Sequence, residues 1–203
     1  MSTTPSTPVR ASRSPRLFIA LWPTPAVRAA VRAWRAAIRW PPHAAVVSEE
    51  RLHLTLHFIG AVPNALWPHL LPALQVPCGR IEIDLSAARQ WPHGLVVLPA
   101  LSTPPPLHAL HGALAVALAD LGLPVERRAF RPHVTLARRA PGAGLPALAA
   151  PLRWRCESYA LVNSDPVQGY RVLARFGPRG IRLARAPRTA TTQTRPVPAP
   201  TPR

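Results

Sequence analysis

The chain has 203 residues and a formal net charge of +17, and its basic side chains are all arginine. Hydrophobic residues make up 48% of it, enough for one well-cored domain or for two lobes that share a core. No apolar run approaches the roughly 20 residues of a membrane-spanning helix, so we predict a cytoplasmic protein.

Both ends of the chain are rich in Ser, Thr, Pro and Arg and poor in apolar residues. Such segments bury too little apolar surface to offset the entropy lost on ordering. We therefore predict disordered tails over residues 1–15 and 186–203 and a folded domain over residues 16–185. Residues 16–185 alone still contain 20 arginines and only 8 acidic residues. This balance favours a polyanionic partner, with a solvated basic surface as the alternative.

The first predicted elements alternate in type. An apolar run over residues 16–21 predicts a buried strand. Thr24 and Pro25 then begin a helix, as its N-cap and first-turn residues. A second strand is predicted over residues 51–59, and a helix interrupted by prolines over residues 63–76.

The second half of the chain repeats this alternation. Strict alternation of apolar and polar residues predicts a half-buried strand over residues 80–87. Leucines at helical spacing predict a helix over residues 105–121, which Gly122 ends. Further strands are predicted over residues 94–98, 132–138, 158–163 and 170–176. The order of these elements predicts an α+β fold made of two similar lobes.

A short motif occurs twice, 80 residues apart, at His53 to Leu56 and at His133 to Leu136. Both copies read His-x-Thr-x with an apolar residue at each x. Alternate side chains of a strand share a face, so the His and Thr of each copy point together and the apolar residues point into a core. Two such strands facing each other would place two imidazoles and two hydroxyls in one cleft. This set suits metal-free acid–base chemistry on a phosphodiester.

The paired motif and its flanks resemble the 2H phosphoesterase superfamily, and within it the RNA 2′,3′-cyclic phosphodiesterases, historically called 2′-5′ RNA ligases. The resemblance spans residues 16–185 and rests on segments 16–21, 52–60, 130–138 and 164–170. It implies an α+β fold of two pseudo-symmetric lobes, each an antiparallel sheet with helices outside, enclosing a central basic cleft. It also implies hydrolysis of RNA 2′,3′-cyclic phosphate ends to 2′-phosphomonoesters, with no metal or other cofactor.

The same resemblance implies roles for individual residues. His53 would be the proton donor and His133 the proton acceptor, two roles that the sequence itself does not distinguish. Thr55, Thr135 and Arg138 would bind the phosphate oxygens. Strict alternation puts Arg138 on the face opposite His133, so it reaches the cleft only if the strand ends or bulges there.

Three further residues are candidates for lining the cleft: Phe18, His57 and Tyr170. Phe18 and Tyr170 could stack on a nucleobase, although packing in the core suits Phe18 as well. Alternation puts His57 on the same face as His53. These two histidines could also be read as metal ligands, but no acidic residue or cysteine lies at a useful spacing, so we predict no metal site.

We expect a monomer that acts on RNA with a 2′,3′-cyclic phosphate end, such as transfer RNA fragments, or on cyclic nucleotides, with no membrane partner. One alternative is the same site run in reverse, joining a cyclic phosphate end to a 5′-hydroxyl as a 2′-5′ linkage. A second is a non-catalytic RNA-binding module, whose binding would survive replacement of both motif histidines. A third is a metallohydrolase through His53 and His57, which a chelator would inactivate.

Overall fold

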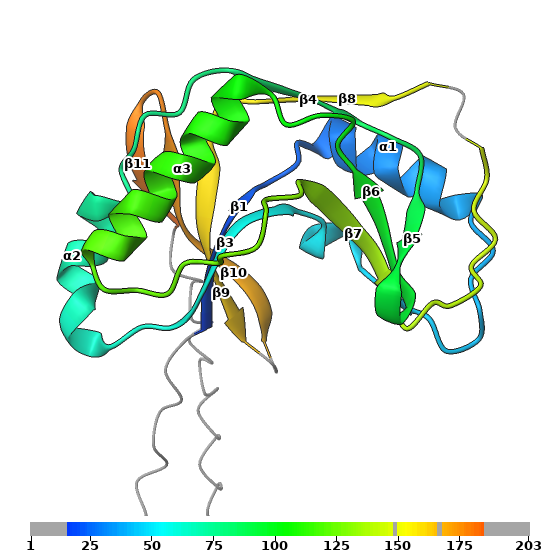
Figure 1. The fold of residues 1–203 in the computed structure, drawn as a ribbon, viewed down its shortest axis with the longest axis horizontal. Helices are drawn as coiled ribbons and strands as arrows, with labels where there is room; N and C mark the ends of the chain where they lie inside the picture. Colours follow the sequence, from blue (N-terminus) through cyan, green and yellow to red (C-terminus); the bar gives the residue numbers. More distant parts are fainter. Residues whose placement is uncertain (1–15, 148–149, 166–167, 185–203) are drawn as a thin grey trace, which may run out of the picture.

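A computed structural model describes residues 16–147, 150–165 and 168–184 (Figure 1). The two tails that we predict to be disordered lie outside these residues. The helices are α1 (Pro25–Ala36), α2 (Trp67–Ala73) and α3 (Pro105–Asp120), with short 3₁₀ turns η1 (Glu49–Arg51), η2 (Asn64–Leu66) and η3 (Pro92–Gly94). The strands are β1 (Arg16–Leu21), β2 (Ala45–Val46), β3 (Leu54–Ala61), β4 (Ile81–Leu85), β5 (Arg89–Trp91), β6 (Leu95–Pro99), β7 (His133–Arg138), β8 (Leu152–Cys156), β9 (Tyr159–Asp165), β10 (Gly169–Gly177) and β11 (Gly180–Leu183).

The fold is α+β with antiparallel sheets, as predicted. In the described residues, one long sheet has the strand order β11-β10-β9-β1-β3-β7-β6-β5, with β2 added on β7. Strands β4 and β8 form a separate ribbon, which lies between helices α3 and α1 at the top of Figure 1. The two motif strands β3 and β7 are neighbours in the long sheet, joined through the pair of Leu54 and Val134.

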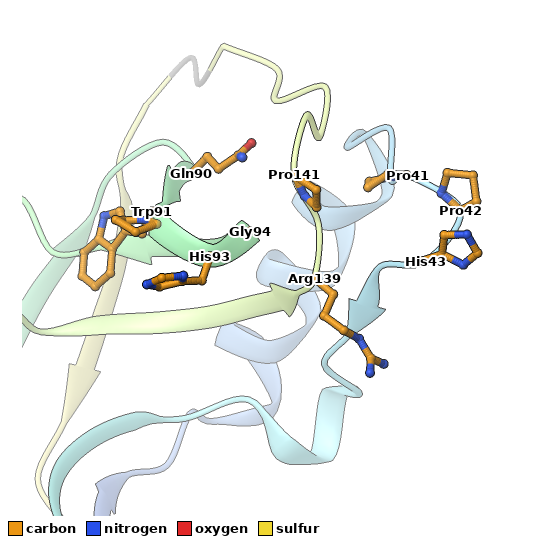
Figure 2. A pocket seen from close by; sticks show the side chains of 10 residues that line it. Pro41, Pro42, His43, Gln90, Trp91, His93, Gly94, Arg139 and Pro141 are labelled. Atoms are coloured by element: carbon orange, nitrogen blue, oxygen red, sulfur yellow. The ribbon is translucent and has the colours of Figure 1, made fainter.

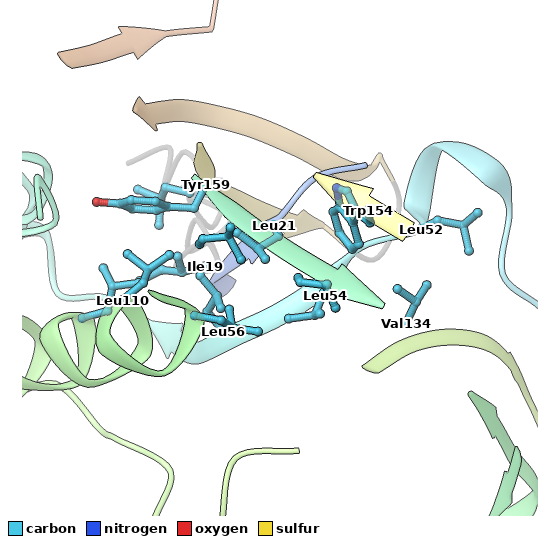
Figure 3. Packing of buried hydrophobic residues seen from close by; sticks show 14 of the residues in the cluster. Ile19, Leu21, Leu52, Leu54, Leu56, Leu110, Val134, Trp154 and Tyr159 are labelled. Carbon is cyan, nitrogen blue, oxygen red and sulfur yellow. The ribbon is translucent and has the colours of Figure 1, made fainter. Parts of the chain in front are cut away.

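The larger of two hydrophobic clusters in the described residues lies between the long sheet and the outer elements (Figure 3). Helix α3 contacts β3, and α1 contacts β8. Helix α3 contributes a stripe of buried leucines at helical spacing, as predicted: Leu107, Leu110, Leu114 and Leu118. The apolar motif positions Leu54 and Val134 are buried in the same core, so both motif strands turn their other face away from it.

The predicted elements are confirmed, with small shifts at their ends. Helix α1 begins at Pro25, and the Thr24 hydroxyl accepts a hydrogen bond from the backbone N–H of Val27, as an N-cap should. Strand β3 begins only at Leu54, because residues 49–51 form the turn η1. Strands β2, β5, β8 and β11 were not predicted from the sequence. In the described part of the chain, no helix is long and apolar enough to cross a membrane.

Candidate active site

The two His-x-Thr-x motifs meet at the junction of β3 and β7. The pair of Leu54 and Val134 lies at the centre of both motifs, and the strands run in opposite directions. The antiparallel direction therefore brings the histidine of each motif toward the threonine of the other. A pocket of about 350 Å³ opens on this side of the sheet, and its lining includes His53, Thr55, His133 and Thr135. The predicted meeting of two imidazoles and two threonines is thus present.

Both motif strands carry a β-bulge directly after their threonine. Between β1 and β3, Ala20 pairs with Thr55 but Ile19 pairs with His57, so Leu56 is an extra residue. Between β6 and β7, Val97 pairs with Thr135 but Val96 pairs with Ala137, so residue 136 is extra in the same way. Each bulge reverses the alternation of side chains beyond it.

The bulge in β7 brings Arg138 into the pocket. Leu136 and Ala137 are both buried, and Arg138 returns to the side that His133 and Thr135 occupy. Its side chain lines the pocket, and its positive charge adds to burial, the main cause, in lowering the pKa of His133. Of the two conditions that we predicted for Arg138 to reach the cleft, a strand end or a bulge, the structure shows the bulge.

The bulge in β3 has the opposite effect on His57, and our placement of this residue in the cleft was wrong. Its side chain is only 2% exposed and points into the core, where its ring stacks on that of His111 at a centroid distance of 4.1 Å. Nε2 donates a hydrogen bond of 2.9 Å to the backbone carbonyl of His111. His57 therefore does not share a face with His53, and the two histidines do not form the ligand pair of the metallohydrolase alternative.

The buried histidine pair predicts acid-sensitive stability. Burial, and secondly the proximity of His57, lowers the pKa of His111 to about 4, against 6.5 for an ordinary histidine. The unfolded chain binds this proton near pH 6.5 and the folded chain only near pH 4, so stability is lost as pH falls through this interval. Allowing for solvent screening, we expect a loss of ~1–2 kcal/mol in the free energy of unfolding.

Urea unfolding followed by tryptophan fluorescence at pH 7.5 and 4.5 measures this loss. The control is His111→Phe, which keeps an aromatic ring between His57 and Phe130 but does not titrate. We expect a smaller loss in this variant. An equal loss in wild type and variant would contradict the prediction.

The two motif histidines are held by equivalent hydrogen bonds. The Nδ1 atom of His53 lies 2.6 Å from the carbonyl oxygen of Arg51, and Nδ1 of His133 lies 2.7 Å from that of Arg131. A carbonyl only accepts, so Nδ1 must donate in both rings. This assignment leaves Nε2 of each imidazole to exchange protons with a bound molecule.

Both motif histidines have lowered pKa values. Burial is the main cause for each, and it outweighs the hydrogen bond to the backbone, which acts in the other direction. The charges of His133 and Arg138 lower the pKa of His53 further. His53 therefore lies close enough to His133 for the charge of His133 to lower its pKa, although burial contributes more.

Arg51 is a second cation in the pocket, and it was not among the site residues predicted from the sequence. It lines the pocket beside His53, and its guanidinium lies over the ring of Tyr170, 5.3 Å from the centroid. Two arginines, Arg51 and Arg138, thus line the pocket, and in the part of the chain that the structure describes its lining has no acidic residue. The position of Arg51 two residues before His53 was a signal that could have found it.

Aromatic rings surround His53. Trp22 is stacked parallel to it at 5.7 Å, and Tyr170 meets it edge-on at 5.4 Å. Phe18 lies 4.8 Å from His53 but is only 4% exposed, so it supports the imidazole and has no free face for a base. Tyr170 is 37% exposed and lines the pocket.

A different aromatic residue accompanies the second histidine. Trp91, at the end of the short strand β5, lies 4.6 Å from the ring of His133. This contact was not predicted because β5 has three residues, too few for a periodic signal.

Comparison with known proteins places this chain in a family. A family model described as the 2′-5′ RNA ligase superfamily matches residues 23–168. The RNA 2′,3′-cyclic phosphodiesterase of Thermus thermophilus is 33% identical over 190 residues, covering 81% of this chain and 91% of that protein. The enzyme of the same name from Escherichia coli is 34% identical over 139 residues, covering 65% and 76%.

Solved structures agree with the sequence matches. Escherichia coli LigT complexed with 3′-AMP has a TM-score of 0.70 at 27% identity, covering 81% of this chain and 98% of that one. Thermus thermophilus TT0787 has a TM-score of 0.69 at 28% identity, with the same coverage. The chain belongs to the 2′-5′ RNA ligase superfamily.

Proposed function

We propose that this protein is an RNA 2′,3′-cyclic phosphodiesterase that opens the cyclic phosphate to a 2′-phosphomonoester. The observation that carries the proposal is the pocket in which His53 and His133 both offer Nε2 beside Thr55, Thr135 and Arg138. Two relatives of this chain carry that name, and the similar structure of Escherichia coli LigT is a complex with 3′-AMP, a ribonucleotide with a phosphate on its ribose. The substrate is RNA with such an end, or a cyclic nucleotide.

The proposed reaction moves two protons. Nε2 of His133 takes a proton from water, and the water oxygen forms a bond to phosphorus. The bond from phosphorus to O3′ breaks, and protonated Nε2 of His53 donates a proton to O3′. Each imidazole ends in the protonation state in which the other began, and exchange with solvent restores both. The acid and base roles come from the family resemblance.

The remaining pocket residues bind the substrate. Thr55, Thr135 and Arg138 hold the non-bridging oxygens, on which charge develops in the transition state. Arg51 adds a second positive charge, and the exposed ring of Tyr170 offers a surface for the nucleobase. Because Tyr170 lies beside His53, this surface is on the side of the leaving ribose oxygen.

We further propose that residues 16–185 act as one bilobal domain. Strands β11, β10, β9, β1 and β3 form one lobe, and β7, β6, β5 and β2 the other, with the paired motif strands as their junction. The pocket at this junction is the central part of a basic cleft, to which Arg51 and Arg138 contribute.

Product analysis tests the proposed function. A short RNA ending in 2′,3′-cyclic phosphate is incubated with the protein in excess chelator, and ³¹P NMR distinguishes a 2′-phosphate from a 3′-phosphate. The control RNA ends in a 3′-phosphate. We expect the 2′-phosphate from the cyclic substrate alone. No turnover, turnover that chelator abolishes, or a 3′-phosphate product would contradict the proposal.

The position of the Arg51 side chain depends on a neighbouring glycine, Gly169. A substitution of this glycine should therefore change activity. Gly169 has φ +79°, and a Cβ there would lie 2.7 Å from the guanidinium of Arg51. In Gly169→Ala the guanidinium must shift from its present position, and we expect kcat/KM for the cyclic phosphate to fall about tenfold, as for loss of a charged hydrogen bond. Gly180 is a matched control, because it has φ +80° but only Gln75 at 4.0 Å.

Gly180→Ala carries the same backbone strain of about 1 kcal/mol, so it separates strain from the displacement of Arg51. We expect it to lower the unfolding free energy by a similar amount and to leave kcat/KM near wild type. Gly169→Ala should add nothing to Arg51→Ala in kcat/KM. If the losses in kcat/KM of Gly169→Ala and Arg51→Ala add in the double variant, Gly169 acts through a residue other than Arg51.

A further inference from the structure

Two arginines lie side by side on one face of the long sheet. In the hairpin of β10 and β11, Arg175 is directly opposite Arg182. Like charges at directly opposed positions of neighbouring strands are destabilising. Both side chains are exposed, and in the described residues neither belongs to an ion pair. The hairpin therefore keeps two cations together without a carboxylate that would offset their repulsion.

The register of the sheet puts this arginine pair on the same face as the pocket that contains both motifs, here called the motif pocket. Arg175 pairs with Ala160 of β9, and Ala160 pairs with Ala20 of β1. Ala20 in turn pairs with Thr55 of β3, which lines the motif pocket. Directly paired residues of neighbouring strands share a face. One row across five strands thus begins at a motif threonine and ends at Arg182.

The two hydrophobic clusters agree with this assignment of faces. Phe176, the neighbour of Arg175 along β10, is buried in the larger cluster, on the other side of the sheet. The two alanines of the row belong to the smaller cluster. Trp22 packs against this smaller cluster and is stacked on the ring of His53 at 5.7 Å. Apolar side chains, including an aromatic ring, therefore lie between His53 and the two arginines.

A third cation lies near the pair. The charge of Arg28, at the start of α1, adds to partial burial, the main cause, in lowering the pKa of Arg175. Arg28 is half-buried, and it too has no ion pair within the part of the chain that the structure describes. Arg28, Arg175 and Arg182, from three different elements, form one positively charged group, here called the Arg175 cluster. Guanidinium groups gathered in this way suit the phosphates of a polyanion.

A pocket on the other side of the motifs does not offer such a group of charges. It lies beside β5 and the end of β7 and has a volume of about 690 Å³ (Figure 2). Among the described residues, its lining contains a single arginine, Arg139, and shares no residue with the lining of the motif pocket. Prolines and histidines form most of its wall. This pocket thus offers one guanidinium, whereas the Arg175 cluster offers three.

We propose that the Arg175 cluster binds backbone phosphates of an RNA strand on the 5′ side of its 2′,3′-cyclic phosphate end. This inference rests on the proposed function, in which the last ribose lies beside His53 and its base beside Tyr170. Tyr170 and Arg175 belong to the same strand, so β10 leads from the base to the cluster. With about 4.8 Å between neighbouring strands, β10 lies roughly 14 Å from β3, where the cyclic phosphate reacts.

The proposed path predicts a preference for RNA over cyclic mononucleotides. A cyclic mononucleotide has one phosphate, and that phosphate occupies the motif pocket. It therefore has no group that the Arg175 cluster could bind. An RNA of several nucleotides carries further phosphates, which guanidinium groups bind through paired, charge-assisted hydrogen bonds. The negative charge of these phosphates also offsets the repulsion between Arg175 and Arg182.

Kinetics with substrates of increasing length test this inference. We measure kcat/KM for a 2′,3′-cyclic mononucleotide and for RNAs of two, four and six nucleotides with the same cyclic end. The variants are Arg175→Gln and Arg182→Gln, singly and together. Arg171→Gln is the matched control, because it removes the same charge from an exposed position of the same strand. Its neighbour Val172 packs against the smaller cluster, so Arg171 points to the opposite face.

We expect kcat/KM of wild type to rise about tenfold from the mononucleotide to the six-nucleotide RNA, as for gain of a charged hydrogen bond. The double variant should lose this gain and stay within twofold of wild type on the mononucleotide. Arg171→Gln should stay within twofold on both. Each phosphate contact adds about 0.7 to the salt slope of single-strand binding, so the double variant's slope on the longest RNA should fall by about 1.4.

Urea unfolding separates phosphate binding from a structural role of the two arginines. Since their removal relieves a repulsion, the unfolding midpoint of the double variant should be equal to that of wild type or higher. The inference is overturned if wild type shows no dependence on length. It is also overturned if the double variant loses as much activity on the mononucleotide as on the longest RNA, or if Arg171→Gln has the same effect as Arg175→Gln.

A binding measurement does not depend on turnover. Fluorescence anisotropy gives Kd for a labelled six-nucleotide RNA that ends in a 2′-phosphate. We expect Kd to rise about tenfold in the double variant and to change less than twofold in Arg171→Gln. Equal Kd values for the double variant and wild type would overturn the inference. If wild type hydrolyses no cyclic substrate but binding shows the expected pattern, the proposed function has failed and the phosphate site has not.

Discussion

His53→Ala and His133→Ala should each lower kcat/KM for a 2′,3′-cyclic phosphate RNA by about 10²–10⁴-fold, the usual effect of removing a general acid or base. Both imidazoles are held through Nδ1 by a backbone carbonyl, so their Nε2 atoms are pre-positioned toward the same pocket. In each alanine variant water would have to replace the imidazole, and it donates or accepts a proton less efficiently than an imidazole held at a fixed position. Initial-rate kinetics with purified variants measures the loss.

A substrate with a good leaving group separates the two histidines. Bis(p-nitrophenyl) phosphate releases a nitrophenolate, which needs no protonation. On this substrate we expect His53→Ala to lose much less activity than on RNA, and His133→Ala to remain strongly impaired. The reverse result would exchange the acid and base roles. The non-catalytic RNA-binding module would be favoured if wild type shows no turnover and the variant with both His53→Ala and His133→Ala binds RNA as tightly as wild type.

Arg138→Gln should lower kcat/KM by about 10²–10³-fold, as for the loss of one donor to a transition-state oxyanion. The bulge in β7 aims this side chain at the pocket, and glutamine keeps most of its stem without the charge. Arg179→Gln is the control, because it removes an exposed arginine from the turn after β10. Activity equal to wild type in Arg138→Gln would remove this residue from the proposed site.

The pH profile of Arg138→Gln gives an independent readout of the same residue. The acid His53 must be protonated and the base His133 neutral, and both pKa values lie below 6.5, mainly through burial. The maximum of kcat/KM for wild type should therefore lie below pH 6.5. The charge of Arg138 contributes to both lowered pKa values, so its removal should move both limbs of the profile to higher pH. Arg179→Gln should leave the profile in place.

The sequence determined the fold class and the central residues of the site, because both depend on local patterns. Strand and helix periodicity predicted α3 and β7 within one residue of their observed ends, and it predicted that α1 and β3 exist, with larger shifts at one or both ends. Alternation along a strand then predicted that His and Thr of each motif share one face, and the pocket at the β3–β7 junction contains all four side chains. The apolar residues of each motif can be read directly from the sequence. Because they are buried, the histidine and threonine between them must lie on the opposite face of the strand.

Only the tertiary structure decided which residues join this set, because bulges and distant contacts leave no periodic signal. Equivalent bulges turn Arg138 toward the pocket and His57 into the core, although strict alternation predicts the reverse for both. Register of neighbouring strands fixes each bulge, so its position depends on β1 and β6 as well as on the motif itself. The contacts of Arg51 with Tyr170 and of Trp91 with His133 join segments more than 40 residues apart, and folding alone brings them together.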